Sequence, residues 1–137
     1  MVYSHNLEIA TTASKQAVDI TSRVAKVVSD SGIEEGIVVV FAKHTTTGLF
    51  INEREGGLQR DVEGVLAKLV PAASGYHHDG IDDNAASHIQ SVLLGASLAV
   101  PIGGGELELG TWQSIFLAER DGPRTRTVAV KVIGERP

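Results

Sequence analysis

The chain has 137 residues, 42% of them hydrophobic, which suits one domain with a buried core and is too short for two. It contains no cysteine, which excludes disulfide bonds, thiolate metal ligands and a cysteine nucleophile. The net charge of −5 argues against nucleic acid as a partner, because nucleic-acid binders are usually basic.

Predicted elements begin with a short edge strand over Leu7–Thr12. A helix is expected to open at Asp19-Ile20-Thr21 and to end at Gly32, with Ile20, Val24, Val27 and Val28 on its apolar face. Ile37–Ala42 is a continuous apolar run between glycines, the pattern of a strand covered on both faces. This run is also the longest apolar one, far too short to span a membrane.

The middle of the chain predicts a strand over Leu49–Glu53 and a helix over Gly57–Val70, which Pro71 stops. Ala72–Asp83 is expected to be a polar loop. A further helix over Ala85–Ala96 would turn one set of residues to the core: Ala85, His88, Ile89, Val92, Leu93 and Ala96.

The last forty residues favour strands throughout. Leu98–Ile102 and Glu106–Leu109 flank three glycines, a hairpin signal, and two longer strands are expected over Trp112–Glu119 and Thr125–Ile133. The order of elements predicts a single α+β domain over residues 1–137. No signal peptide is evident at the N-terminus, so we expect a cytoplasmic protein.

The histidines are the most informative side chains: His5, His44, His77, His78 and His88. His44 directly follows the apolar strand, while His88 lies near the start of its predicted helix, for which Asn84 is the expected N-cap. No pair has a recognised local metal-ligand spacing, so a metal site would have to assemble in the tertiary structure. The alternative is that His44 caps a strand, His88 is a hydrogen-bonded core residue and the other two are solvated.

Four stretches of the sequence closely resemble the YjbQ-like family, whose members are often described as secondary thiamine-phosphate synthases. The resemblance runs in the right order over nearly the whole chain. It is carried by His44–Glu53, by Tyr76-His77-His78 with Asn84–His88, by Leu94–Ser97, and by Leu109–Gln113 with Glu119–Arg124.

This resemblance implies two packed, mostly antiparallel β-sheets with flanking helices, assembled as a homotrimer. It also implies a divalent metal ion, zinc first among the choices, held by His44, His78 and His88. The family pattern selects His78 over His77 as the loop ligand. Three imidazoles with an open fourth position are typical of a catalytic zinc site, although nickel, cobalt or iron(II) suit the same ligands. A site of two histidines and one carboxylate is a minor alternative.

Several polar residues are candidates to line such a site. Thr45, Thr46, Asn84 and Arg124 are expected to bind substrate, with Arg126 on the same face of the strand as Arg124. Glu53, Glu119 and Gln113 are the candidate catalytic residues, Glu53 as a general base and the other two as lining residues on one strand face. Each of them has an ordinary structural alternative.

The predicted function is a metal-dependent enzyme that acts on a small phosphorylated or anionic substrate. The resemblance implies thiamine-phosphate synthase activity, the joining of a pyrimidine diphosphate to a thiazole phosphate. Hydrolysis by a metal-activated water would suit the same site. The alternative from a different class is a non-catalytic trimeric protein that binds a metal or small ligand.

Overall fold

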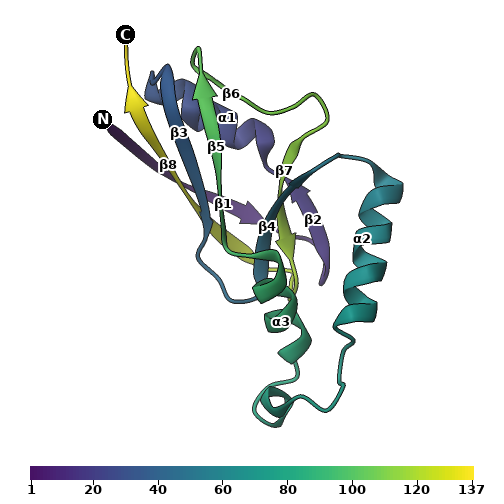
Figure 1. Ribbon diagram of the computed structural model, residues 1–137. Coiled ribbons are helices and arrows are strands. Elements are labelled where there is room, and N and C mark those ends of the chain that lie inside the picture. Colours follow the sequence, from purple (N-terminus) through teal and green to yellow (C-terminus); the bar gives the residue numbers. More distant parts are fainter.

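The computed structural model describes residues 1–137 as an α+β fold with two antiparallel sheets and three α-helices (Figure 1). This confirms the predicted fold class. The elements are β1 (Val2–Ala10), β2 (Gln16–Asp19), α1 (Thr21–Ser31), β3 (Glu35–Ala42), β4 (Thr47–Asn52), α2 (Gly56–Leu69), the 3₁₀ turn η1 (His77–Gly80), α3 (Ala85–Leu94), β5 (Ser97–Gly103), β6 (Glu106–Leu107), β7 (Ser114–Glu119) and β8 (Thr125–Glu135).

The large sheet has the strand order β1-β8-β3-β5-β6 and the small sheet the order β2-β7-β4. The main hydrophobic core lies between α1 and the inner faces of both sheets, and it joins Val24 and Val28 of α1 to Val40 and Val130 of the large sheet and Leu117 of the small one. Helix α1 ends as predicted at Gly32, whose φ of 69° is the left-handed conformation that glycine adopts without steric cost.

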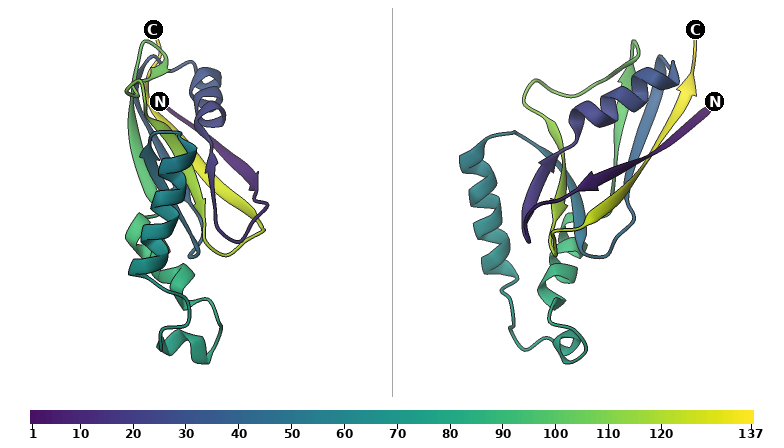
Figure 2. Two further views of the ribbon diagram at one scale, coloured as in Figure 1. Left: turned by 90° about the vertical axis from the view of Figure 1, so that its right-hand side faces the viewer. Right: turned by 180° about the vertical axis from the view of Figure 1, so that it is seen from behind.

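The large sheet is covered on one face only, which corrects the expectation that Ile37–Ala42 is covered on both. Val38 and Val40 are buried, whereas Ile37 is 41% and Phe41 45% exposed, because side chains alternate along the strand and only the inner face meets the core. Figure 2 shows α1 against one side of this sheet, with the other side of its upper part bare. An apolar outer face therefore remains uncovered in the single chain.

Helix α3 turns a polar face inward, which corrects the predicted apolar one. Ser87, Gln90 and Ser91 are buried, whereas Val92 is 80% exposed and Leu93 59%. The buried side chains donate hydrogen bonds to backbone carbonyls of distant segments: Ser87 to Arg120, Gln90 to Val70, and Ser91 to Thr47. These bonds anchor α3 to β4 and to the end of β7, and so fix the position of His88.

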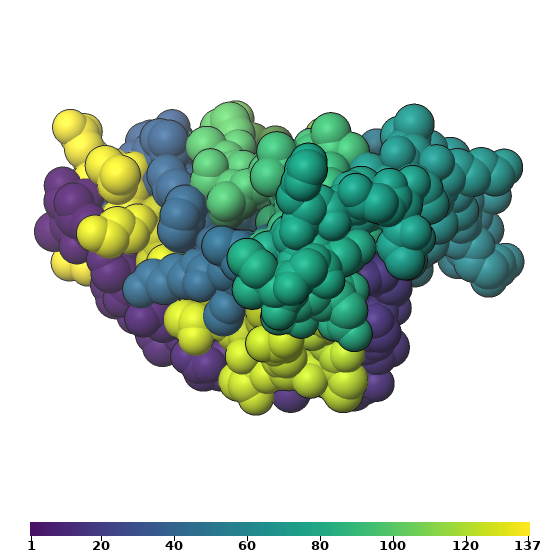
Figure 3. All heavy atoms as spheres, turned by 90° about the horizontal axis from the view of Figure 1, so that it is seen from below, coloured from purple at the N-terminus to yellow at the C-terminus, as the bar shows by residue number.

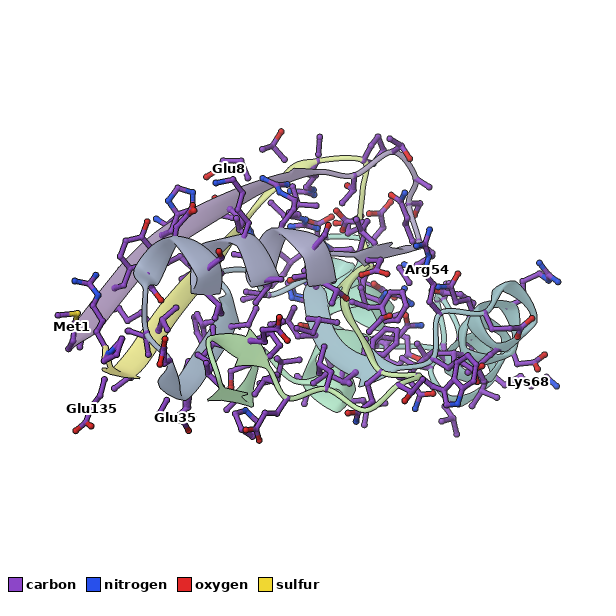
Figure 4. All side chains as sticks on the ribbon, turned by 90° about the horizontal axis from the view of Figure 1, so that it is seen from above. Met1, Glu8, Glu35, Arg54, Lys68 and Glu135 are labelled. Carbon is purple, nitrogen blue, oxygen red and sulfur yellow. The ribbon has the colours of Figure 1, made fainter.

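Helix α2 lies on the outer side of the small sheet, where Phe50 and Phe116 stack with their ring centroids 5.0 Å apart. It begins one residue before the predicted start, because the Glu55 carboxylate accepts hydrogen bonds from the first helical N–H groups. Seen from above, Lys68 near its end lies far from Met1 and Glu135 at the opposite end of the molecule (Figure 4). None of the helices is long and apolar enough to cross a membrane.

Candidate functional site

An open polar cleft of about 380 Å³ lies where the end of β3, the start of α3 and the segment after β7 meet, and we call it the histidine cleft. Figure 3 shows the three segments side by side from below, in blue, teal-green and yellow-green. No hydrophobic side chain lines the cleft. The lining residues are Lys43, His44, Thr45, Thr46, Asp82, Asn84, His88, Asp121, Arg124 and Arg126.

His44 is held by the backbone of β8. Beyond the last residue of β3, Lys43 N–H still donates to the carbonyl of Thr127, and the N–H of Thr127 donates to Nε2 of His44 at 2.8 Å. The imidazole thus accepts the hydrogen bond that a backbone carbonyl of β3 would accept if the β3–β8 pairing continued. Burial and then the nearby Arg126 guanidinium lower the pKa of His44, so the ring is neutral at pH 7. Because Nε2 accepts, the single ring proton is on Nδ1.

His88 lines the cleft, and His78, which does not line it, packs against His88. Their ring centroids are 4.8 Å apart in an edge-to-face arrangement, and η1, within the predicted polar loop, brings His78 there. Nε2 of His78 lies 3.1 Å from Oδ1 of Asn84, whose Nδ2 donates to Oδ2 of Asp121 at 3.0 Å. Asn84 is the N-cap residue of α3, as predicted, but its side chain makes no capping hydrogen bond and instead links His78 to Asp121.

The three-histidine metal centre does not assemble in this chain. No group of three or more His, Asp or Glu side chains is arranged so that it could hold a metal ion. His78 and His88 meet, but the accepting nitrogen of His44 is bound to Thr127. The residues present thus fit a pair of imidazoles and not the predicted triad.

Arg126, which lines the cleft, forms a buried ion pair with Glu119, which does not. Nε and Nη2 of Arg126 donate to the two carboxylate oxygens at 2.8 and 2.5 Å, and Nη2 also donates to Thr46 Oγ1. Burial alone raises the pKa of Glu119, but hydrogen bonds from Arg126, from the Asp121 N–H and from Thr11 outweigh it and lower the pKa to about 2. Glu119 is therefore an anion at neutral pH that positions Arg126, and it is a poor candidate for a general acid or base.

Arg124 lies at the mouth of the cleft, with its side chain 55% exposed. It donates from Nε to the carbonyl of Asp121 and from Nη2 to its carboxylate at 3.0 Å, which leaves Nη1 outside these bonds. Thr45 is exposed beside it, and Thr46 is buried. The predicted substrate-binding residues Thr45, Thr46, Asn84 and Arg124 thus all line one cleft.

Two predicted catalytic residues lie elsewhere. Glu53 lines a separate small apolar pocket beneath α2, together with Phe50 and Leu58. Gln113 precedes β7 in an exposed turn, where its side chain accepts a hydrogen bond from Gly110 N–H at 2.8 Å, so it does not share a strand face with Glu119 as predicted. The prediction extended β7 two residues too far, across this turn.

Sequence reasoning did not single out Lys43, Asp82 or Asp121 as site residues. Lys43 directly precedes the stretch that begins at His44, and Asp121 lies within Glu119–Arg124; the stretches that carry the family resemblance were thus the available signal. Asp82 had no such signal, because it reaches the cleft only through the path of the loop before α3.

Comparisons with known proteins agree with the resemblance seen in the motifs. The family model for YjbQ-like UPF0047 proteins matches residues 5–135. The chain is 48% identical over 134 residues to a UPF0047 protein of Methanothermobacter thermautotrophicus, covering 98% of this chain and 94% of that protein. It is 36% identical to the UPF0047 protein YugU of Bacillus subtilis, covering 93% and 97%.

Solved structures are similar over the full fold. A YjbQ-like protein of unknown function from Sulfolobus solfataricus superposes with a TM-score of 0.96 at 38% identity, covering 98% of this chain and 99% of that chain. A hypothetical protein from Aeropyrum pernix gives a TM-score of 0.94 at 34% identity, covering 97% and 99%. The names of these relatives state no activity.

Proposed function

The chain belongs to the YjbQ-like UPF0047 family, and from this premise we propose that its histidine cleft binds a small phosphorylated or otherwise anionic substrate and acts on it. The observation that supports this most strongly is the lining of the cleft, where the exposed Lys43 and Arg124 lie together with His44 and the exposed Thr45. Directed N–H donors and cations of this kind are what phosphate and carboxylate groups require.

The cleft is also lined by the carboxylates of Asp82 and Asp121, so its charge is mixed and not purely positive. Oδ2 of Asp121 accepts hydrogen bonds from Asn84 and Arg124, which orient the carboxylate, while Oδ1 takes no part in them. Asp121 is therefore our candidate for the group that accepts a proton from a substrate hydroxyl or amine. Glu119 is not, because its side chain is fully buried and a pKa lowered to about 2 makes it a weak base.

If zinc binds, we propose that only His78 and His88 ligate it. Their two imidazoles meet, and water or substrate oxygens would have to complete the coordination of a divalent ion there. We assign no step of the reaction to the metal, because the three-histidine arrangement that would activate a water molecule is not formed.

We further propose that the protein is a homotrimer that covers the outer face of the large sheet. On that face Ile37 pairs directly with Pro101 on one side and Ile133 on the other, and Phe41 lies on the same side of β3. The apolar row of Pro101, Ile37 and Ile133 crosses three adjacent strands and is typical of a surface that contacts another protein, while Lys131 lies between this row and Phe41. The cytoplasmic location expected from the sequence stays a prediction.

Two experiments test the proposed function. Calorimetric titration with inorganic phosphate and pyrophosphate should show saturable binding, which the Arg124→Gln change weakens. Product analysis with a pyrimidine diphosphate and a thiazole phosphate, and with each alone, then separates joining from hydrolysis. Saturable binding without any product would favour the non-catalytic alternative.

A further inference from the structure

We propose that His44 is a fixed hydrogen-bond donor to an anionic oxygen of the substrate, through Nδ1–H, and that it is not a metal ligand. The inference rests on the proposed function, because it assigns a role within the same cleft. It also separates His44 from the two histidines with which the family resemblance groups it.

The donor role follows from the partner of the ring. A backbone N–H can only donate, so the atom of His44 that lies 2.8 Å from Thr127 N must be a nitrogen with a free lone pair. Turning the ring over would replace that nitrogen by a C–H group and lose the bond. The neutral ring then has its proton on Nδ1, and a protonated nitrogen cannot bind a metal ion.

Metal binding by His44 would break a hydrogen bond at the edge of the β3–β8 pairing. For His44 to ligate a metal through Nε2, Thr127 N–H would lose its acceptor at the point where β8 continues beyond the end of β3. The carbonyl of the same residue is already engaged by Lys43 N–H, so the backbone on both sides of the contact is fixed. A part-buried N–H without a partner is costly, which favours the arrangement seen.

The surroundings suit a neutral donor. Arg124 supplies positive charge near His44 and Glu8 negative charge, whereas Arg126 and Glu119 largely neutralise each other in their ion pair. Lys43 and Arg124 can attract the anion, and Nδ1–H of His44 gives it a direction. A rigid donor of this kind distinguishes between oxygen positions better than a flexible lysine does.

Nitrogen-15 NMR of the imidazoles in the intact protein tests the inference directly. We expect His44 to be the neutral Nδ1–H tautomer, with a resonance that shifts when inorganic phosphate is added and does not respond to zinc alone. An Nε2–H tautomer, or loss of the Nδ1 proton on zinc addition, would overturn it.

Two substitutions provide an independent readout. In His44→Gln the side chain can still accept from Thr127 N–H but has no donor at the Nδ1 position, so phosphate affinity should fall about tenfold. In His44→Asn the amide offers a donor near the Nδ1 position, so affinity should fall less, although the contact with Thr127 is lost. Equal affinities for both variants and the unchanged protein would overturn the inference.

The proposed function and this inference fail differently. If phosphate binds in an Arg124-dependent way but neither the His44 resonance nor the glutamine variant responds, the cleft keeps its function and His44 loses its role. If no phosphate or pyrophosphate binds at all, the proposed function itself is wrong.

Discussion

Arg126 and Glu119 form an ion pair whose side chains are 3% and 0% exposed, with Nη2 and Oε2 2.5 Å apart. The pair joins the start of β8 in the large sheet to the end of β7 in the small one. Arg126 lines the cleft, where Thr46 also accepts a hydrogen bond from it. The cleft therefore depends on a polar contact between the two sheets.

Replacing Glu119 by Gln should lower the free energy of unfolding by about 3 kcal/mol, because the buried guanidinium of Arg126 would lose its counter-charge. Urea denaturation followed by circular dichroism measures this change. Glu8→Gln is the matched control, since Glu8 is exposed, and it should change stability by less than about 0.5 kcal/mol. A Glu119 variant as stable as this control would show that the pair is dispensable.

Acid should remove the same contribution. The pKa of Glu119 falls from 4.5 to about 2 on folding, so its carboxylate stabilises the fold at pH values above 4.5 and this stabilisation is lost as the pH falls toward 2. We expect a loss of about 3 kcal/mol across that window from this residue. Urea titrations at several acidic pH values should give a flatter dependence for Glu119→Gln than for the unchanged protein.

The Arg124→Gln change should weaken phosphate binding about tenfold or more, because it removes a charge-assisted donor at the mouth of the cleft. Isothermal titration calorimetry measures the affinity. Arg60→Gln is the control, since Arg60 is an exposed arginine of α2 that does not line the histidine cleft. Equal losses in the two variants would point to a general charge effect.

A charge on the bare face of the large sheet should prevent assembly. Phe41→Lys places an ammonium group on this outer face, between Ser97 and Ala129, and burying it in an interface would be unfavourable. Light scattering should give a mass near three times 14.5 kDa for the unchanged protein and a lower mass for this variant. Val92→Lys, on the exposed side of α3, should leave the mass unchanged. The reverse result would place the interface on the helices.

Metal analysis should separate the histidines. Zinc retained after dialysis is expected to be lost in His88→Ala and in His78→Ala, because these two imidazoles meet, and to be kept in His77→Ala. Mass spectrometry of the dialysed protein for zinc, nickel, cobalt and iron measures this. Loss of zinc in the His77 variant but not in the His78 variant would show that His77, and not His78, is the ligand from the loop.

Local pattern was enough for much of the fold. Helix α1 and its glycine stop, the proline after α2 and the β5–β6 hairpin depend on periodicity and on residues with restricted backbone conformations, and all of these were predicted from the sequence. Pattern was misleading for α3, because its buried Ser87, Gln90 and Ser91 satisfy carbonyls of distant segments that no local rule includes.

The sequence by itself determined the family, the α+β class and the short polar stretches that line the cleft. Tertiary structure alone decided which of those side chains meet: it put His78 against His88, gave the lone pair of His44 to Thr127 and buried Glu119 with Arg126. The physical reason is that hydrogen bonds and ion pairs depend on distances of about 3 Å between atoms. Packing sets these distances both for His44 and Thr127, 83 positions apart, and for Glu119 and Arg126, which are 7 positions apart but belong to different sheets.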